Sequence, residues 1–282
     1  MATLAMRMTE LPSGEAIPVL GMGTWRLGSG RHRPQQEIAA LRLGLDLGMT
    51  LVDTAEMYGD GASERLVGRA IADRREDVFL VSKVLPQHAT TRGTIAACEA
   101  SLRRLGADHL DLYLLHWRGT AALEETVAGF EALIAAGWIR HWGVSNFDIA
   151  DMTELLRVPG GAQVETDQVL YNLNRRGIEW DLLPWAQSMG LPIMAYSPIE
   201  QGRLAGDPVL TEIAERHGAT AAQIALAWVL REEKVCAIPE AGTPDHVIEN
   251  RRALDLRLTS DDLVELDRAF PPPTGPQPLE VI

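Results

Sequence analysis

The feature that most constrains the fold of this chain is a regular alternation of short apolar runs with longer segments of helical periodicity. The apolar runs are rich in β-branched residues and bounded by turn residues, which is typical of buried strands. Several helical segments end at a glycine, a common residue at helix C-termini. The expected strands are one near Met22 and the runs 51–55, 78–84, 110–116, 139–145, 163–169, 192–197 and 235–239. The expected helices are 35–47, 63–71, 92–105, 122–136, 148–157, 179–189, 207–217, 221–231, 244–253 and 259–268, with Ser63 and Thr259 as N-caps.

Strands that alternate with helices in this way predict an α/β fold, a (β/α)8 TIM barrel with extra helices. Turn signals between the apolar patches of residues 9–20 predict a β-hairpin before the barrel. A length of 282 residues suits one such barrel, so we expect a single domain over residues 1–282. The alternative is a doubly wound sheet, but its Gly-x-Gly-x-x-Gly turn lacks the third glycine after Gly21 and Gly23. The proline-rich residues 271–282 are expected to lie extended over the surface.

The charge balance bears on the class of partner. The net charge is −13, and no block of Lys and Arg is present. Such a chain is not expected to bind nucleic acid or an anionic membrane. The N-terminal stretch has no apolar run long enough for a leader, and Cys98 and Cys236 are too far apart for a metal-binding pair. We therefore expect a cytoplasmic protein with free thiols and a small-molecule partner, either a monomer or a weak homo-oligomer.

Reactive side chains stand where successive strands end. Asp53, Lys83 and His116 are separated by 30 and 33 residues, about one βα unit each. Each has an alternative explanation, such as a lysine that reaches solvent or a hydrogen-bonded core histidine. In a parallel barrel, however, all strand ends share one rim, so these three side chains are expected to converge with Tyr58. Ser145, Asn146, Gln168 and Tyr196 also lie near strand ends.

This group of residues suits carbonyl reduction. We expect Asp53 to pair with Lys83, and the Lys83 ammonium to lower the pKa of Tyr58 so that the phenol gives up its proton more readily. His116 is expected to donate a hydrogen bond to the substrate oxygen. No Ser–His–Asp arrangement for peptide hydrolysis is evident, and no cluster of ligands predicts a metal site.

At these residues the chain resembles the aldo-keto reductase family, most closely its shorter bacterial members. The resemblance spans nearly the whole chain. Its motifs are Gly21-Met-Gly-Thr-Trp25, Asp53-Thr-Ala-Glu-Met-Tyr-Gly59, Leu80-Val-Ser-Lys83, Leu110-Asp-Leu-Tyr-Leu-Leu-His-Trp117, Gly143-Val-Ser-Asn-Phe147, Gln168-Val-Leu-Tyr-Asn172, Ala195-Tyr-Ser-Pro198 and Ile238-Pro239 with Glu249-Asn250. It implies reduction of aldehydes and ketones with NAD(P)H, with Tyr58 as general acid and His116 as the residue that orients the carbonyl.

The resemblance also implies a set of cofactor contacts. Ser145, Asn146 and Gln168 would hold the carboxamide, and Tyr196 would stack on the nicotinamide. The pyrophosphate would follow Ser197, Ile199, Gln201 and Gly202, and Asn250 would meet the adenine. The remaining implied contacts are Thr24, Trp25, Asp53, Ile238 and Glu240.

Two departures from the family pattern concern this cofactor. Asp167 stands where the family often has Asn. Glu240 and His246 replace the Lys and Arg that usually bind the 2′-phosphate of NADP. A carboxylate repels a phosphate but accepts hydrogen bonds from a free ribose, so we expect NADH to be accepted or preferred. The alternative is that Arg203, Arg251 or Arg252 rescues NADPH binding.

The implied substrate pocket includes Trp25, Tyr58, His116 and Trp117. Because the loop after residue 117 and the C-terminal tail are short, we expect an open pocket for varied, even bulky, carbonyl compounds. Two other classes remain as alternatives. One is an aldo-keto-like regulatory subunit that senses redox state with little turnover, and the other is a barrel lyase or hydrolase.

Overall fold

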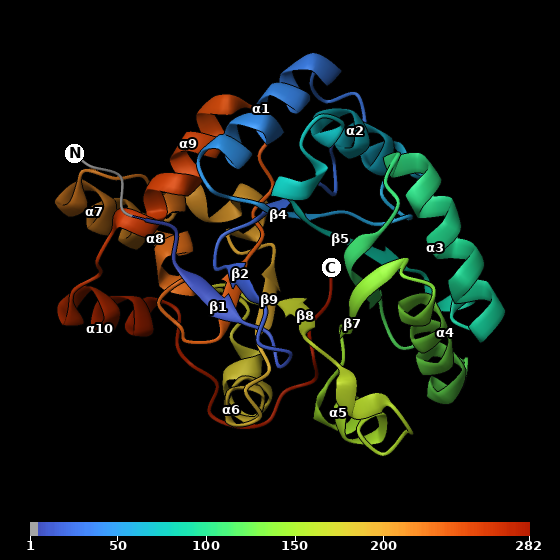
Figure 1. Ribbon diagram of the computed structural model, residues 1–282. Helices are drawn as coiled ribbons and strands as arrows, with labels where there is room; N and C mark the ends of the chain where they lie inside the picture. Colours follow the sequence, from blue (N-terminus) through green and yellow to red (C-terminus); the bar gives the residue numbers. More distant parts are fainter. Residues whose placement is uncertain (1–4) are drawn as a thin grey trace.

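The computed structural model describes residues 5–282, in which parallel strands form a central sheet surrounded by helices (Figure 1). Residues 1–4 lie outside the described residues. They begin the N-terminal stretch in which no leader is expected. The strands are β1 (Met8–Glu10), β2 (Ala16–Pro18), β3 (Met22–Gly23), β4 (Leu51–Asp53), β5 (Phe79–Val84), β6 (Leu110–Leu115), β7 (Ile139–Ser145), β8 (Asp167–Leu170), β9 (Ile193–Tyr196) and β10 (Val235–Ala237). The α-helices are α1 (Pro34–Asp46), α2 (Ala62–Ile71), α3 (Thr91–Leu105), α4 (Leu123–Ala135), α5 (Ile149–Leu155), α6 (Leu182–Ser188), α7 (Pro208–His217), α8 (Ala221–Val229), α9 (Pro244–Arg252) and α10 (Ser260–Ala269).

Strands β3 to β10 pair in chain order, every pair parallel. Parallel bridges from Leu20 to Ala237 and from Gly23 to Glu240 join the two edges of this sheet. A Cβ atom at Gly23 would lie 2.6 Å from the Ile238 carbonyl oxygen, so only glycine permits this approach. The predicted (β/α)8 barrel is therefore confirmed.

The predicted hairpin is also confirmed. β1 and β2 pair antiparallel before the first barrel strand, and Figure 1 draws them across the barrel in blue. Leu11 and Ile17 of this hairpin belong to the same apolar cluster as the interior strand residues Leu51 and Phe79. The hairpin thus contributes apolar side chains to the interior of the barrel.

Three local predictions need correction. Ser63 is not an N-cap: Gly61, at φ 79°, precedes α2, and the buried Ser63 hydroxyl donates to the Thr24 carbonyl instead. The strand expected from residue 163 begins at Asp167, because Gly161–Gln163 form a 3-10 turn. Helix α6 begins three residues later than expected, because a 3-10 turn at Gly177–Glu179 precedes it. By contrast, Thr259 caps α10 as predicted.

Alternation along the strands explains how the reactive side chains reach the barrel interior. The interior apolar cluster includes Leu51, Val81 and Leu114. Two residues further along each strand, on the same face of the sheet, stand Asp53, Lys83 and His116. The apolar layer therefore forms the floor beneath these three polar groups, at the carboxyl ends of the strands. None of the helices in residues 5–282 is long and apolar enough to cross a membrane.

Candidate active site

Lys83 lies at the centre of the site and is completely buried. Its ammonium donates to Asp53 Oδ2 at 2.7 Å, to the Thr54 carbonyl at 2.9 Å and to the Tyr58 hydroxyl at 3.0 Å. An ammonium has three N–H donors, so all of them are used. Because the Tyr58 oxygen accepts from Lys83, its own hydroxyl hydrogen remains available to another acceptor. Thr54 contributes through its backbone carbonyl. The residue lies within the motif Asp53-Thr-Ala-Glu-Met-Tyr-Gly59, but its residue type does not indicate this role.

The expected lowering of the Tyr58 pKa is wrong in direction. Burial raises the pKa of Tyr58 well above its ordinary value, and the charges of Asp53 and Glu240 raise it further. The Lys83 ammonium does not reverse this, because the Asp53 carboxylate at 2.7 Å balances its charge. Tyr58 is therefore a neutral phenol that carries its proton at neutral pH.

Asp53 is held from both sides. Its Oδ2 accepts from Lys83, while its Oδ1 accepts from Gln168 Nε2 at 2.8 Å. Burial raises the pKa of Asp53 and lowers that of Lys83, and their mutual attraction opposes both shifts. Gln168 also contacts the Met194 sulfur at 2.9 Å. The Gln168 amide, expected at the carboxamide, therefore lies beside the Asp53–Lys83 pair.

His116 faces Tyr58, with ring centroids 5.8 Å apart and an edge-on arrangement. Burial, with a smaller effect from the Lys83 charge, lowers the pKa of His116 to about 2. The imidazole is therefore neutral at physiological pH and carries one N–H. Its buried Nδ1 has no partner among the described residues, so no acceptor holds the proton there. Trp117 lies against His116, with ring centroids 4.9 Å apart.

Asn146 connects this group to Tyr196. Its Nδ2 donates to the His116 carbonyl at 3.0 Å and its Oδ1 accepts from the Tyr196 hydroxyl at 2.9 Å. Asn146 adopts φ 60°, a left-handed conformation that is uncommon outside glycine. Ser145 donates to the Gln168 carbonyl at 2.7 Å. Ser145, Asn146 and Tyr196 thus form one wall, next to His116.

The C-terminal tail closes part of this wall. Residues 271–282 contain no helix or strand, as predicted. However, the Ile282 backbone lies against Tyr196, and Leu279 packs against the core. The tail therefore reaches the Tyr196 side of the site, and the expected open pocket stays a prediction.

The loop after β9 is strained where the cofactor contacts are expected. Of the six described non-glycine residues with positive φ, three are Ser197, Glu200 and Gln201 in this loop, close to Ile199 and Gly202. Such conformations cost free energy and persist where the surroundings hold them. Glu200 provides this support: it is 2% exposed and accepts from Asn172 at 2.7 Å and Arg203 at 2.8 Å. Glu200 was not among the predicted site residues, although its partner Asn172 ends the motif Gln168-Val-Leu-Tyr-Asn172.

Next to this loop, the loop after β3 meets the segment after β10. The Arg26 backbone N–H donates to Glu240 Oε2 at 2.8 Å, and the Arg26 guanidinium donates to Gln201 Oε1 at 2.6 Å. Burial raises the pKa of Glu240, an effect that the Arg26 N–H partly offsets. Trp25 is 40% exposed beside this contact. Thr24 is completely buried, and its hydroxyl donates to the Asp53 carbonyl, so its side chain lies behind the site.

The residues expected near the adenosine lie further along this side. Asn250 is 5% exposed, and its Nδ2 has no partner among the described residues. Ile238 is also buried, whereas His246 is exposed in the first turn of α9. A buried amide donor without an acceptor is costly, which is consistent with a site that a ligand completes.

Asp167 differs from the neighbouring polar groups because it pairs with no cation. It is completely buried, its Oδ1 accepts from the Phe147 backbone at 3.5 Å, and its Oδ2 has no partner among the described residues. Burial raises the pKa of Asp167 well above its ordinary value. Burial therefore favours the protonated form of this side chain, which is close in shape to the asparagine that the family pattern often has.

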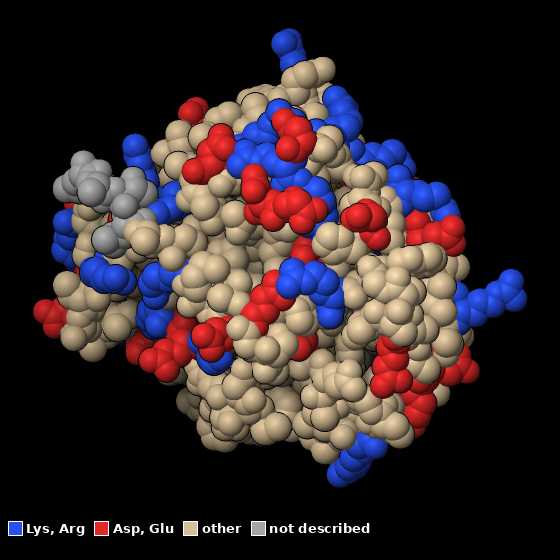
Figure 2. All heavy atoms as spheres, in the orientation of Figure 1, with Lys and Arg blue, Asp and Glu red and all other residues tan. Residues whose placement is uncertain are grey.

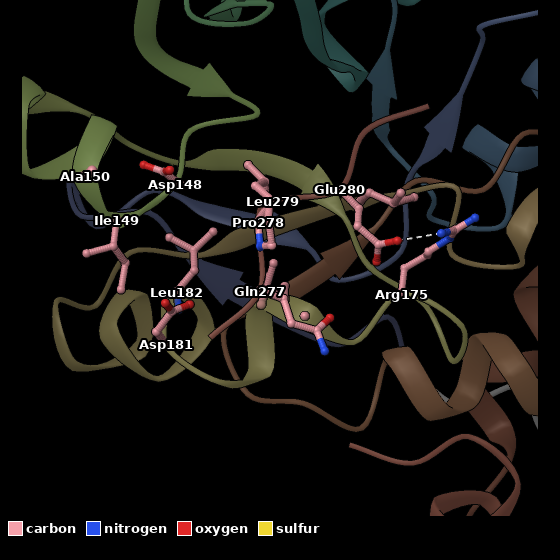
Figure 3. A pocket seen from close by; sticks show the side chains of 13 residues that line it. Asp148, Ile149, Ala150, Arg175, Asp181, Leu182, Gln277, Pro278, Leu279 and Glu280 are labelled. Carbon is pink, nitrogen blue, oxygen red and sulfur yellow. Dashed lines mark hydrogen bonds and ion pairs between the residues drawn. The ribbon is translucent and has the colours of Figure 1, made fainter. Parts of the chain in front are cut away.

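A separate hollow of about 290 Å³ lies under the C-terminal tail (Figure 3). Its lining includes Ile149, Leu182 and Leu279, and Arg175 pairs with Glu280 at its edge. It contains none of Tyr58, Lys83 and His116, so it is distinct from the barrel-end site. Within residues 5–282, no group of three or more His, Cys, Asp and Glu residues could hold a metal ion.

Comparisons with known proteins identify the family of this chain. Residues 19–270 match the Aldo/keto reductase family. The chain is 51% identical to "Methylglyoxal reductase YeaE" of Escherichia coli K12, with 99% of this chain and 100% of that protein covered. It is 32% identical to "Glyoxal reductase" of Bacillus subtilis, with both chains fully covered. A crystal structure of an aldo-keto reductase from Klebsiella pneumoniae in complex with NADPH is 48% identical, with TM-score 0.96, 99% of this chain covered and 100% of that chain. The chain therefore belongs to the aldo/keto reductase family.

Proposed function

We propose that this protein reduces aldehydes and ketones to alcohols with a nicotinamide cofactor, and that Tyr58 is the general acid. The observation that carries the proposal is the set of three hydrogen bonds from the buried Lys83 ammonium to Asp53, Thr54 and Tyr58. This arrangement leaves the phenolic hydrogen free beside a neutral His116. A group that donates a proton as negative charge develops on oxygen is what carbonyl reduction requires.

Each side chain has a defined part in this proposal. The His116 N–H and the Tyr58 hydroxyl hold the carbonyl oxygen. As charge builds on that oxygen, Tyr58 passes its proton to it, and Lys83 stabilises the resulting phenolate. Asp53 keeps Lys83 charged and oriented. A bound reduced nicotinamide supplies the hydride that the carbonyl carbon receives.

The residues fit such a cofactor. Ser145, Asn146 and Gln168 offer polar groups for the carboxamide, and Tyr196 offers a ring for stacking. Ser197, Ile199, Gln201 and Gly202 would follow the pyrophosphate, and Asn250, whose amide nitrogen has no partner among the described residues, would meet the adenine. The Klebsiella relative with NADPH supports the cofactor class.

Substrate class is proposed from the site and the relatives together. The curated relatives are named for methylglyoxal and glyoxal, two small dicarbonyl compounds. His116 lies edge-on to the Tyr58 ring, and Trp117 lies against His116, so aromatic groups border the reactive hydroxyl. We propose that small α-dicarbonyl compounds are reduced more efficiently than bulky ketones.

A spectrophotometric assay tests the function. The purified chain is mixed with reduced cofactor and methylglyoxal, and loss of the nicotinamide absorbance is followed. The proposal expects turnover that saturates with substrate and yields an alcohol. Cofactor binding without turnover across a panel of aldehydes and ketones would instead support the regulatory alternative. A product formed without cofactor consumption would support a lyase or hydrolase.

We further propose that NADH is accepted, because Glu240 occupies the position where the family usually has a lysine. The substitution Glu240→Lys should raise the NADPH-to-NADH ratio of kcat/KM by about tenfold or more, since attraction replaces repulsion at a partly buried position. The matched control Asp245→Lys makes a similar charge change at an exposed position on α9 and should shift the ratio much less. A wild-type enzyme with a large NADPH preference would contradict the proposal.

A further inference from the structure

Four arginines converge on one shallow groove on the outside of the barrel. The groove, about 550 Å³ in volume, lies between α2 and α3 and is lined by Arg65, Arg69, Ala100, Arg103 and Arg104. We call it the arginine groove. In Figure 2, basic side chains gather at the upper right, in the part of the view where Figure 1 places these two helices. This concentration is unusual in a chain of net charge −13.

Two of the four guanidiniums have no carboxylate partner. Arg103 pairs with Glu99, and Arg104 pairs with the buried Glu64. Arg65 donates to the Asp60 carbonyl at 3.2 Å, and no hydrogen bond or ion pair of Arg69 is found within residues 5–282. Arg65 and Arg69 are exposed and stand four residues apart on α2, a spacing at which like charges repel. The free protein therefore keeps unbalanced positive charge in the groove.

The rest of the groove is rigidly built. The Arg104 guanidinium is fixed by Glu64 and by the Ser101 hydroxyl at 3.1 Å. Glu64 is completely buried and also accepts from Ser82 at 2.7 Å. The Arg104 side chain packs so closely on Gly61 that a Cβ atom there would clash with it. One wall of the groove is thus preorganised, and the opposite wall carries the two guanidiniums without carboxylate partners.

We propose that the arginine groove binds an anion that carries two or more phosphate groups. A guanidinium presents paired N–H donors that match a phosphate, and several guanidiniums around one hollow match several phosphates. The charge of such a ligand relieves the repulsion between Arg65 and Arg69. An inorganic oligophosphate and a nucleoside triphosphate share this chemistry, and the experiment separates them.

Isothermal titration calorimetry of the full chain tests the site, with inorganic tripolyphosphate and ATP as the two probes. We expect saturable binding by the wild type. The double variant Arg65→Ala/Arg69→Ala should bind at least about tenfold more weakly, since it removes two groups that donate charge-assisted hydrogen bonds to phosphate. Equal affinity for both probes assigns the site to the phosphates alone, whereas tighter, groove-dependent ATP binding shows that a nucleoside contributes.

The control is the double variant Arg157→Ala/Arg268→Ala, which removes two exposed arginines elsewhere. It should bind both probes as the wild type does. Both variants alter the surface only, and thermal unfolding checks that each is folded. The proposal is overturned if the wild type shows no saturable binding of either probe, or if the two double variants lose affinity equally.

Discussion

Replacing Lys83 with methionine tests the buried charge pair at the centre of the site. Methionine has a similar length but no charge, so the substitution removes the hydrogen bonds to Asp53, Thr54 and Tyr58 together. The Asp53 carboxylate then remains 2% exposed, with Gln168 at 2.8 Å as its one remaining side-chain donor. Removal of one partner from a buried ion pair costs about 3–5 kcal/mol. Lys83→Met should therefore lower the free energy of unfolding by that amount.

The double variant Asp53→Asn/Lys83→Met separates charge from packing. It leaves no buried charge, so it should recover much of the stability lost in Lys83→Met while remaining inactive. Urea unfolding of the wild type and the variants at neutral pH measures these differences. A cost below about 1 kcal/mol for Lys83→Met, typical of an exposed ion pair, would refute the reasoning. A double variant no more stable than the single one would also refute it.

Three further predictions concern titration. Because the pKa of His116 is about 2, its imidazole is uncharged near neutrality, and the pH profile of kcat/KM should show no inflection near its ordinary value of 6.5. The His141 ring donates hydrogen bonds to the Glu165 and Glu15 carboxylates, which raise its pKa, so its stabilising charge is present below pH 6.5 and lost as pH rises through the raised value. Urea unfolding across pH should show this loss in the wild type and not in His141→Gln. Burial raises the pKa of Asp167, so the folded protein favours the protonated side chain and loses stability as pH rises toward that raised value. Asp167→Asn should therefore be more stable than the wild type at alkaline pH. Equal pH dependence of the two proteins in urea unfolding would contradict this.

The barrel and its reactive rim could be predicted because two sequence periods coincide. Side chains alternate between the two faces of a strand, which places Lys83 and His116 on the same face as the interior residues. The βα repeat brings the strand ends together. Both features are local patterns, so they can be recognised in the sequence without knowledge of how the side chains pack. The boundaries failed where 3-10 turns intervened, as at Gly161–Gln163, because short turns leave no periodic signal.

The direction of the shift in the Tyr58 pKa could not be predicted from the sequence, for a physical reason. The sequence indicates that a cation lies near the phenol, but the outcome depends on burial and on the charge that balances the cation. The sequence also could not show that Glu200 supports the strained loop, because this support depends on its contacts with Asn172 and Arg203 in the folded chain. Likewise, only the folded chain places Ile282 against Tyr196.

The proposed mechanism requires that the Tyr58 hydroxyl supplies the proton. The most direct measurement is the single-turnover rate of reduced-cofactor oxidation by methylglyoxal, with cofactor affinity measured in parallel by fluorescence, for Tyr58→Phe. Tyr113→Phe is the matched control, because Tyr113 is also completely buried, and its ring packs against Phe130 of α4. The account predicts that Tyr58→Phe loses about 10²–10⁴-fold in rate with cofactor affinity unchanged, while Tyr113→Phe keeps the wild-type rate. A Tyr58→Phe variant that turns over at nearly the wild-type rate would contradict it.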